Sequence, residues 1–485
     1  MAEEDGDRAE PALATADDWD ELLDFMTLCF CENGVTEPFE KVIPRLYRPQ
    51  CVGLNAILKQ GPMERIKSAT LLAPYSWVVG EARLRAGGIG GVSAHPRSRG
   101  QGLMARTVGF QLDKLRTGDY DMAFLWGQRQ RYQYHGFEAC GATPQLTFNQ
   151  HNARHAFANA APAGLSFRPL AATDTATIRA VMALHASQPI HVDRGDDPAE
   201  FWLWLTTWGA QPHVACDGAG AVRGLLVVTG PVHAEKAEIT ELLAESAVVA
   251  SAMVRCWLEG HSEVLKELRV ALSPAAVETQ RLLLEWAESC SLAPAAQTNM
   301  WWILQWESVL DALLKMRLRI AGGVGSLVQG SVTIAIEETT VTLHVDEDGA
   351  RCVEGDGAAE AARQRGRHHG SAQLQHAPAH PDASPSHAAG VGGETPFVIH
   401  QVHAVAHDDD DDGGDDDVSQ PAAAATPTRA SAPTPAAVRV TRRQAMRMLF
   451  GPTRPGMVTA LPPEAAALLE AWCPLPLTWA APDGC

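Results

Sequence analysis

The sequence lacks the features that mark membrane and secreted proteins. No apolar run reaches the roughly 18 to 20 residues that cross a bilayer. The first residues, MAEEDGDRAE, contain neither the basic start nor the apolar stretch of a signal peptide. We therefore expect a cytoplasmic protein without a membrane span.

The spacing of the cysteines and histidines also matches no metal site and no disulfide framework. The ten cysteines are scattered, with one Cys-x-Cys pair at Cys29 and Cys31 and no Cys-x-x-Cys motif. The histidines and the aspartate run of the region after residue 354 follow no ligand spacing of a defined site. We expect reduced structural thiols and no metal.

The chain has fewer basic than acidic residues. The formal net charge is −19, and eight of the negative charges lie in the aspartate run 408–412 and 415–417. The rest of the chain is still acidic, which argues against nucleic acid as a partner. An acidic body would not repel a cationic amine.

With 485 residues, the chain is long enough for several domains. Its pattern changes near residues 150 and 312, which divides it into blocks 1–150, 151–312 and 313–485. The last block contains an insertion, about 354–437, rich in Ala, His, Pro, Gly and Asp. This composition buries too little apolar surface to offset ordering, so we expect disorder there, except for a strand at 397–405.

Hydrophobic periodicity predicts an α/β (α+β) protein. The expected strands are 69–79, 88–94, 122–126, 225–228, 331–336 and 340–345. The expected helices are 17–30, 103–115, 178–184, 238–258 and 441–450, the last with Thr441 as its N-cap.

The stretch 88–104, GIGGVSAHPRSRGQGLM, is the part of the sequence that indicates a binding site. A strand ends at Pro96, a loop with Gly100 and Gly102 follows, and a helix begins near Leu103. Unpaired N–H groups at a helix N-terminus suit a pyrophosphate, which Arg97 and Arg99 can also contact. The spacing matches neither G-x-G-x-x-G nor G-x-x-x-x-G-K-[ST], so the residues alone predict only a phosphate cradle.

The run Arg99-Gly100-Gln101-Gly102-Leu103-Met104 resembles the R/Q-x-x-G-x-G/A motif of the GNAT acetyltransferase superfamily, with Met104 in place of the last small residue. The chain looks like the branch typified by the mycobacterial enhanced-intracellular-survival acetyltransferases. That resemblance implies a mixed-sheet GNAT domain, a second GNAT-like domain without the motif, and a C-terminal domain similar to sterol carrier proteins. It also implies a homo-oligomer.

The resemblance implies a role for each matching position. The strand that pairs with the pantetheine arm corresponds to Val92, Ser93 and Ala94. The pyrophosphate loop corresponds to Arg99, Gly100, Gln101, Gly102, Leu103, Met104 and Ala105, and the turn after the next strand to Gly127 and Gln128.

The pattern Tyr-x-x-x-Gly-aromatic occurs as Tyr132 to Phe137. The resemblance makes Tyr132 the general acid that protonates the leaving thiolate, with Tyr134 as the fallback. It makes the C-terminal carboxylate of Cys485 the base, although the tail ends in Asp-Gly-Cys rather than in an aromatic residue. A frayed tail, with water or Glu32 as the base, is the alternative.

The resemblance implies an acyl-CoA-dependent N-acyltransferase that uses acetyl-CoA as co-substrate. The acceptor would be a small-molecule amine or a lysine side chain. The alternative is a CoA-sensing protein, or one that binds a lipid or apolar ligand in its C-terminal domain. A scaffold that uses the insertion as an interaction tail is the third hypothesis.

Overall fold

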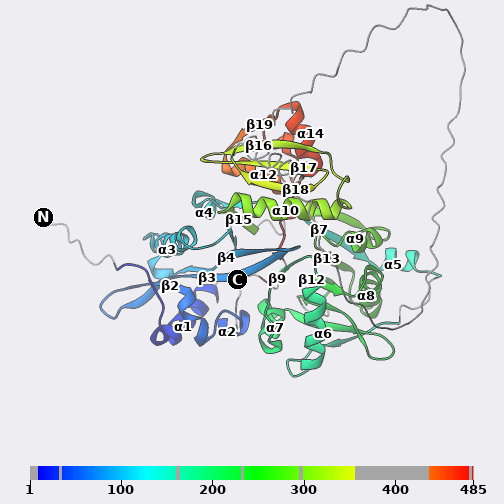
Figure 1. Ribbon diagram of the computed structural model, residues 1–485. Coiled ribbons are helices and arrows are strands. Elements are labelled where there is room, and N and C mark those ends of the chain that lie inside the picture. Colours follow the sequence, from blue (N-terminus) through cyan, green and yellow to red (C-terminus); the bar gives the residue numbers. More distant parts are fainter. Residues whose placement is uncertain are drawn as a thin grey trace, which may run out of the picture. The chain divides into compact units, whose positions relative to one another are not determined.

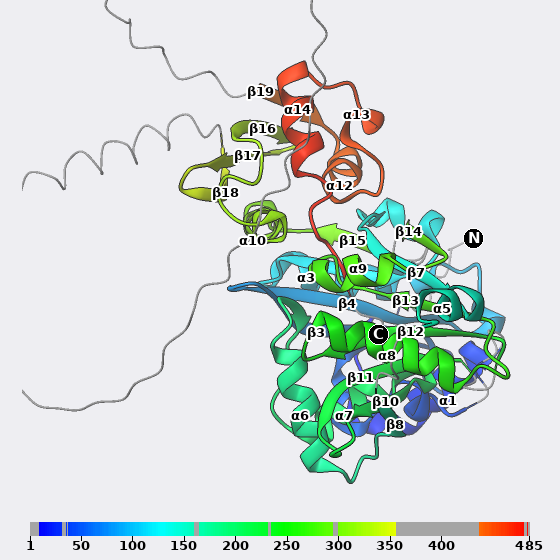
Figure 2. The same cartoon turned by 90° about the vertical axis from the view of Figure 1, so that its right-hand side faces the viewer.

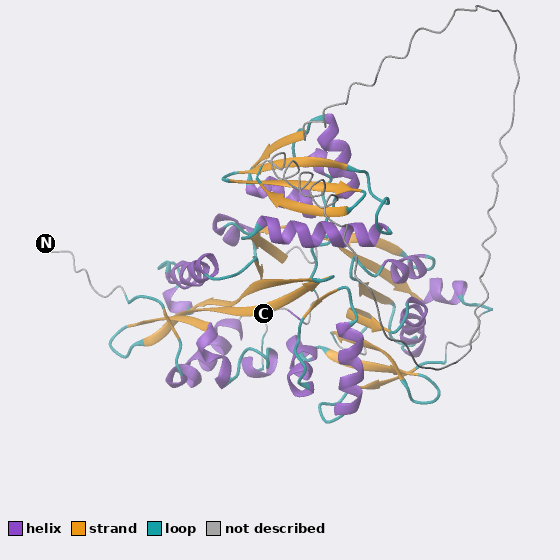
Figure 3. Cartoon of the chain, viewed as in Figure 1, coloured by secondary structure: helices purple, strands orange, loops and turns teal. Residues whose placement is uncertain are grey.

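The fold is built on three β-sheets flanked by helices, which confirms the mixed α/β class (Figures 1 and 3). The structure is a computed structural model that describes residues 9–31, 35, 37–159, 164–230, 234–293, 299–355, 436–479 and 483. The predicted strand at 397–405 and most of the insertion lie outside these residues. None of the helices in the described ranges is long and apolar enough to cross a membrane.

The first sheet has eight strands in the order β1-β2-β3-β4-β5-β15-β6, with β9 paired to β3. They are β1 (Ala12–Leu13), β2 (Asn55–Gln60), β3 (Arg65–Val79), β4 (Ala82–Ala94), β5 (Met122–Trp126), β6 (Glu138–Ala139), β9 (Ile190–Val192) and β15 (Asn299–Ile303). Alternate residues of β3 pack against opposite faces. One face meets α1 (Trp19–Cys31) and α2 (Phe39–Val42), and the other meets α3 (Leu103–Thr117).

The second sheet repeats this plan with seven strands in the order β14-β7-β13-β12-β11-β10-β8. They are β7 (Thr143–Asn149), β8 (Ser166–Pro169), β10 (Gln211–Cys216), β11 (Val222–Thr229), β12 (Lys236–Ala244), β13 (Glu267–Ala271) and β14 (Ser289–Ala293). One face packs against α6 (Thr175–Ala186) and α7 (Pro198–Leu205). The other packs against α5 (Gln150–Ala156), α8 (Ala247–Gly260) and α9 (Val277–Leu284).

The two sheets exchange one strand each. In the first sheet, the strand between β5 and β6 is β15, which comes from the end of the second block. In the second sheet, the strand between β13 and β14 is β7, which follows β6 in the chain. Backbone hydrogen bonds therefore cross the predicted boundary at residue 150 in both directions, and the three-domain division stays a prediction.

The third sheet has four strands in the order β18-β17-β16-β19. They are β16 (Gly330–Ile336), β17 (Thr339–Asp346), β18 (Gly349–Glu354) and β19 (Ala436–Val440). The helices of this block are α10 (Trp306–Ala321), α12 (Arg442–Phe450), α13 (Pro455–Val458) and α14 (Pro463–Trp472). Figure 2 shows α12, α13 and α14 gathered beside the strands. The likeness to sterol carrier proteins remains a prediction.

Most of the predicted elements are confirmed, including β5 at its exact bounds and the capping box of Thr441 with Gln444. The predicted helix 238–258 is wrong in its first third, because β12 occupies 236–244 and the helix α8 begins at Ala247. The burial of β12 alternates along its length, which is the strand period. Its run of helix-favouring Glu, Leu and Ala concealed that period.

Candidate active site

Strands β4 and β5 separate after a short parallel ladder. The two strands run parallel and pair from Ala86 with Met122 to Ile89 with Leu125. Beyond that pair, β4 continues to Ala94 with no ladder partner on the β5 side among the described residues. The overhang therefore has no strand neighbour on this side, although the carbonyl oxygens of Gly91, Ser93 and Ala94 accept side-chain hydrogen bonds from Ser93, Ser68 and Cys29. Val92, Ser93 and Ala94, the predicted pantetheine contacts, belong to this overhang.

A β-bulge bends β4 at the start of the overhang. The register with β3 shifts between the pairs Leu71–Gly90 and Ala69–Ser93. Gly91 lies in the bulge with φ +56°, and a Cβ there would lie 2.1 Å from the hydroxyl oxygen of Tyr47. Only glycine fits this backbone and this contact, so the bulge is built into the sequence.

The glycine loop joins the overhang to α3. Gly100 and Gly102 have φ values of +83° and +74°, and a Cβ at either position would meet no atom within 4 Å. Gly102 is the N-cap of α3, and no side chain caps its first turn. Arg97, Arg99 and Gln101 are exposed. The first N–H groups of α3 and the positive end of its dipole thus face an open loop, as an anion site requires.

Tyr132 lies shortly after the end of β5. It is the last residue of α4 (Arg129–Tyr132), and only 7% of its surface is exposed. A Cβ on Gly127 would lie 2.4 Å from Cε2 of the Tyr132 ring, so the glycine allows the ring to lie against the end of β5. Tyr132 also belongs to the apolar cluster that Val92 and Met104 contact. The fold therefore brings the predicted acid and the predicted cofactor segments together.

Burial raises the pKa of Tyr132 above its ordinary value, and the nearby Arg131 opposes this only in part. The phenol therefore keeps its proton through the neutral range, as a proton donor must. Tyr134, the fallback, is 82% exposed. Its environment supplies no comparable positioning.

The sequence prediction did not include a buried charge cluster near the C-terminus. Arg194 Nε donates to Asp483 at 2.7 Å, and its terminal nitrogens donate to both oxygens of Glu241 at 2.9 and 3.1 Å. His185 Nδ1 lies 3.4 Å from Glu241. Hydrophobic periodicity carries no signal for these residues, because each arginine–carboxylate pair joins distant segments.

The cluster fixes the tail of the chain. Trp479 packs against Tyr75, Trp77, Phe124 and Trp301 of the first sheet. Four residues later, Asp483 reaches Arg194. Cys485, the predicted base, and Glu32, its alternative, both lie outside the described residues.

The comparisons with known proteins agree with this geometry. Residues 10–140 match the family model described as acetyltransferase (GNAT) domain. A probable N-acyltransferase from Enterococcus faecalis V583 is 14% identical with a TM-score of 0.50, covering 72% of this chain and 85% of that one. A GCN5-related N-acetyltransferase from Anabaena variabilis is 14% identical with a TM-score of 0.51, covering 72% and 86%.

Eis1 from Mycobacterium abscessus is also similar, at 14% identity and a TM-score of 0.43, with 70% and 84% covered. That score is too low to support the predicted branch. No curated protein matches the chain. At these identities the solved structures show the fold alone, and the family match supplies the class. The match over residues 10–140 therefore indicates an enzyme with an acetyltransferase (GNAT) domain in that part of the chain.

Proposed function

We propose that the protein transfers an acyl group, most simply acetyl, from acyl-CoA to a primary amine. The observation that supports this proposal is the separation of β4 from β5, which is followed by the uncapped N-terminus of α3. Val92 and Met104 pack against the apolar cluster that contains the ring of Tyr132.

The residues at the separation of β4 from β5 fit acyl-CoA. The overhang Val92–Ala94 would pair with the amides of a pantetheine arm. The loop Arg99 to Ala105 offers backbone N–H groups, the helix dipole and a guanidinium to a pyrophosphate. Gly127 and Gln128 follow β5 directly. Acyl-CoA would supply an activated thioester carbonyl.

The residues of the chain then have two proton tasks. A neutral amine attacks the carbonyl, a C–N bond forms, and the C–S bond breaks. The hydroxyl of Tyr132 donates its proton to the departing sulfur, and the amine proton passes to a base. We assign the base to the C-terminal carboxylate of Cys485, which follows the anchored Asp483 by two residues.

The acidic balance of the chain supports a cationic acceptor, either a small-molecule amine or a lysine side chain. A cytoplasmic location and a homo-oligomer belong to the same proposal through the family resemblance.

The test is thiol release from acetyl-CoA with a panel of polyamines, aminoglycosides and lysine peptides. We expect amine-dependent release by the parent protein. Tyr132→Phe should lower kcat by about a hundredfold, because general acid catalysis contributes about 10²–10⁴-fold. Tyr134→Phe is the matched control and should retain the parent rate.

Release that survives Tyr132→Phe would place the acid elsewhere but keep the enzyme. Tight CoA binding with no release for any amine would contradict the proposal. That outcome would favour a protein that senses CoA, or one that binds an apolar ligand in its C-terminal block.

A further inference from the structure

The second sheet separates two of its strands in the same way as the first sheet. Strands β12 and β13 are parallel and pair from Lys236 with Glu267 to Ile239 with Val270. Beyond that pair, β12 runs on to Ala244 with no ladder partner on the β13 side in the described part of the chain. The register with β11 shifts between the pairs Val228–Ile239 and Val227–Glu241, which leaves Thr240 of β12 as the extra residue of a bulge at the same place. The separation of β4 from β5 is therefore repeated in the second sheet, where it is called the second cleft.

The connection after the strand is different. In the first sheet, residues 95–102 connect β4 to α3 and include two glycines and two arginines. In the second, only Glu245 and Ser246 separate β12 from α8. Ser246 caps the helix itself, because its hydroxyl accepts from the N–H of Val249. The second cleft therefore has the open strand edge, but it has no loop that corresponds to the predicted pyrophosphate loop before α3.

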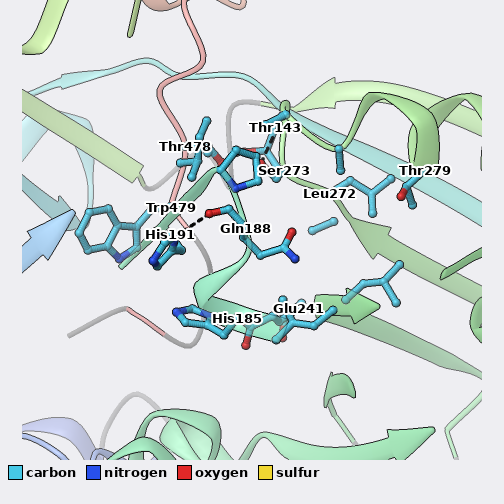
Figure 4. Close-up of a pocket in the computed structure, with 18 of the residues that line it drawn as sticks. Thr143, His185, Gln188, His191, Glu241, Leu272, Ser273, Thr279, Thr478 and Trp479 are labelled. Atoms are coloured by element: carbon cyan, nitrogen blue, oxygen red, sulfur yellow. Dashed lines mark hydrogen bonds and ion pairs between the residues drawn. The ribbon is translucent and has the colours of Figure 1, made fainter. Parts of the chain in front are cut away.

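A cavity of about 980 Å³ occupies this second cleft (Figure 4). The overhang Thr240–Ala244 forms one wall, and the start of α9 with Thr279 forms another. The segment with Gln188 and His191 and the tail residue Trp479 border it as well. Its volume is that of a site for a ligand of peptide or drug size.

The charge of the wall excludes a phosphate-rich ligand. The described lining residues include the carboxylates of Glu238, Glu241, Glu245 and Asp483 and one guanidinium, that of Arg269. Arg194 compensates one charge of the pair Glu241 and Asp483. The remaining negative charge favours a neutral or cationic occupant.

We propose that the cleft between β12 and β13 is a second ligand site that binds an extended, neutral or cationic peptide segment. The peptide adds to the free edge of β12 beyond Ile239. Strand addition of this kind obtains its affinity from main-chain hydrogen bonds. This site does not depend on the proposed acyl transfer.

The probe is the acetylated, amidated tetrapeptide Arg-Ala-Arg-Ala, which has no primary amine and cannot be an acyl acceptor. Calorimetry on the full chain with saturating CoA should give one peptide per chain. Thr279→Trp, which fills the cavity, should weaken peptide binding by at least about tenfold and leave CoA affinity unchanged. Glu278→Trp is the matched control, because residue 278 is the exposed neighbour outside the cavity.

The peptide with alternate amides N-methylated should bind at least about tenfold more weakly if strand pairing holds it. Equal binding of the methylated peptide would overturn the proposal, and so would displacement by CoA or full affinity in Thr279→Trp. Binding of pantetheine without binding of the peptide would assign the edge to a pantetheine arm instead. Ala276→Trp provides a second blocked cavity should Thr279→Trp not fold. Thiol release, measured separately, reports on the proposed function alone.

Discussion

At the scale of single residues, glycines set the position of the predicted acid. The ring of Tyr132 occupies the space where a Cβ of residue 127 would lie, so glycine is the residue that fits at this position. We expect Gly127→Ala to displace this ring and to lower kcat in thiol release by about a hundredfold, as removal of the acid would.

Gly109, inside α3, is the matched control for Gly127→Ala. A Cβ at Gly109 meets nothing within 4 Å. Gly109→Ala should therefore keep full activity and gain about 0.5–1 kcal/mol in free energy of unfolding, since alanine favours the helix. Full activity in Gly127→Ala would show that the Tyr132 ring can move without loss, against the proposed acid.

The raised pKa of Tyr132 predicts the shape of the pH–rate profile. The phenol stays protonated to above about pH 10, its ordinary pKa, because burial disfavours the phenolate. The rate should rise with pH as the acceptor amine and the base lose their protons, and it should not fall before about pH 10. A decline between about pH 7 and about pH 9 in the parent, absent in Tyr132→Phe, would contradict a raised pKa.

At the scale of elements, Glu138 attaches α12 to the first sheet. Its buried carboxylate on β6 accepts from Arg447 of α12 at 2.9 Å and from Arg129 of α4 at 2.8 Å. Desolvation raises its pKa, but the arginines outweigh this and hold the pKa below the ordinary value of 4.5. The stabilisation is therefore complete above about pH 4.5 and is lost as the pH falls through the lowered pKa.

We expect Glu138→Gln to reduce the free energy of unfolding by about 2 kcal/mol near neutral pH, because it removes charge-assisted hydrogen bonds to buried oxygens. The difference from the parent should shrink below about pH 4.5, which urea unfolding at several pH values would measure. Glu278→Gln, in an exposed pair with Arg281, should change stability by less than about 0.5 kcal/mol. An equal loss in both variants would contradict the role of Glu138.

The sequence predicted the elements that local pattern specifies. The loop at Arg99–Gly102 and the start of α3 at Leu103 follow from glycine, proline and apolar spacing, and both are confirmed. The helix predicted at 238–258 was wrong where β12 lies, because short alternation and helix propensity conflict there. The charge cluster of Arg194 and Asp483 could not be predicted, since nothing local relates residues so distant in sequence.

At the scale of the whole molecule, the strand exchange binds the first two sheets into one folding unit. A fragment of residues 1–150 would contain β7 without its partners β13 and β14. It would also leave β5 and β6 without β15 between them. The unpaired edges would expose apolar strands such as 122–126, which is a liability for aggregation.

We therefore expect the fragment 1–150 to show no cooperative unfolding and to aggregate. The fragment 1–305 contains both exchanged strands and should unfold in a single transition, although it lacks the packing of Trp479 against Phe124. Circular dichroism during thermal unfolding, combined with size-exclusion chromatography, would distinguish these outcomes. A monomeric, cooperatively folded fragment 1–150 would show that the first sheet closes without β15. The boundary at residue 150 would then be a real domain boundary, and the exchange would add stability to two units that already fold alone.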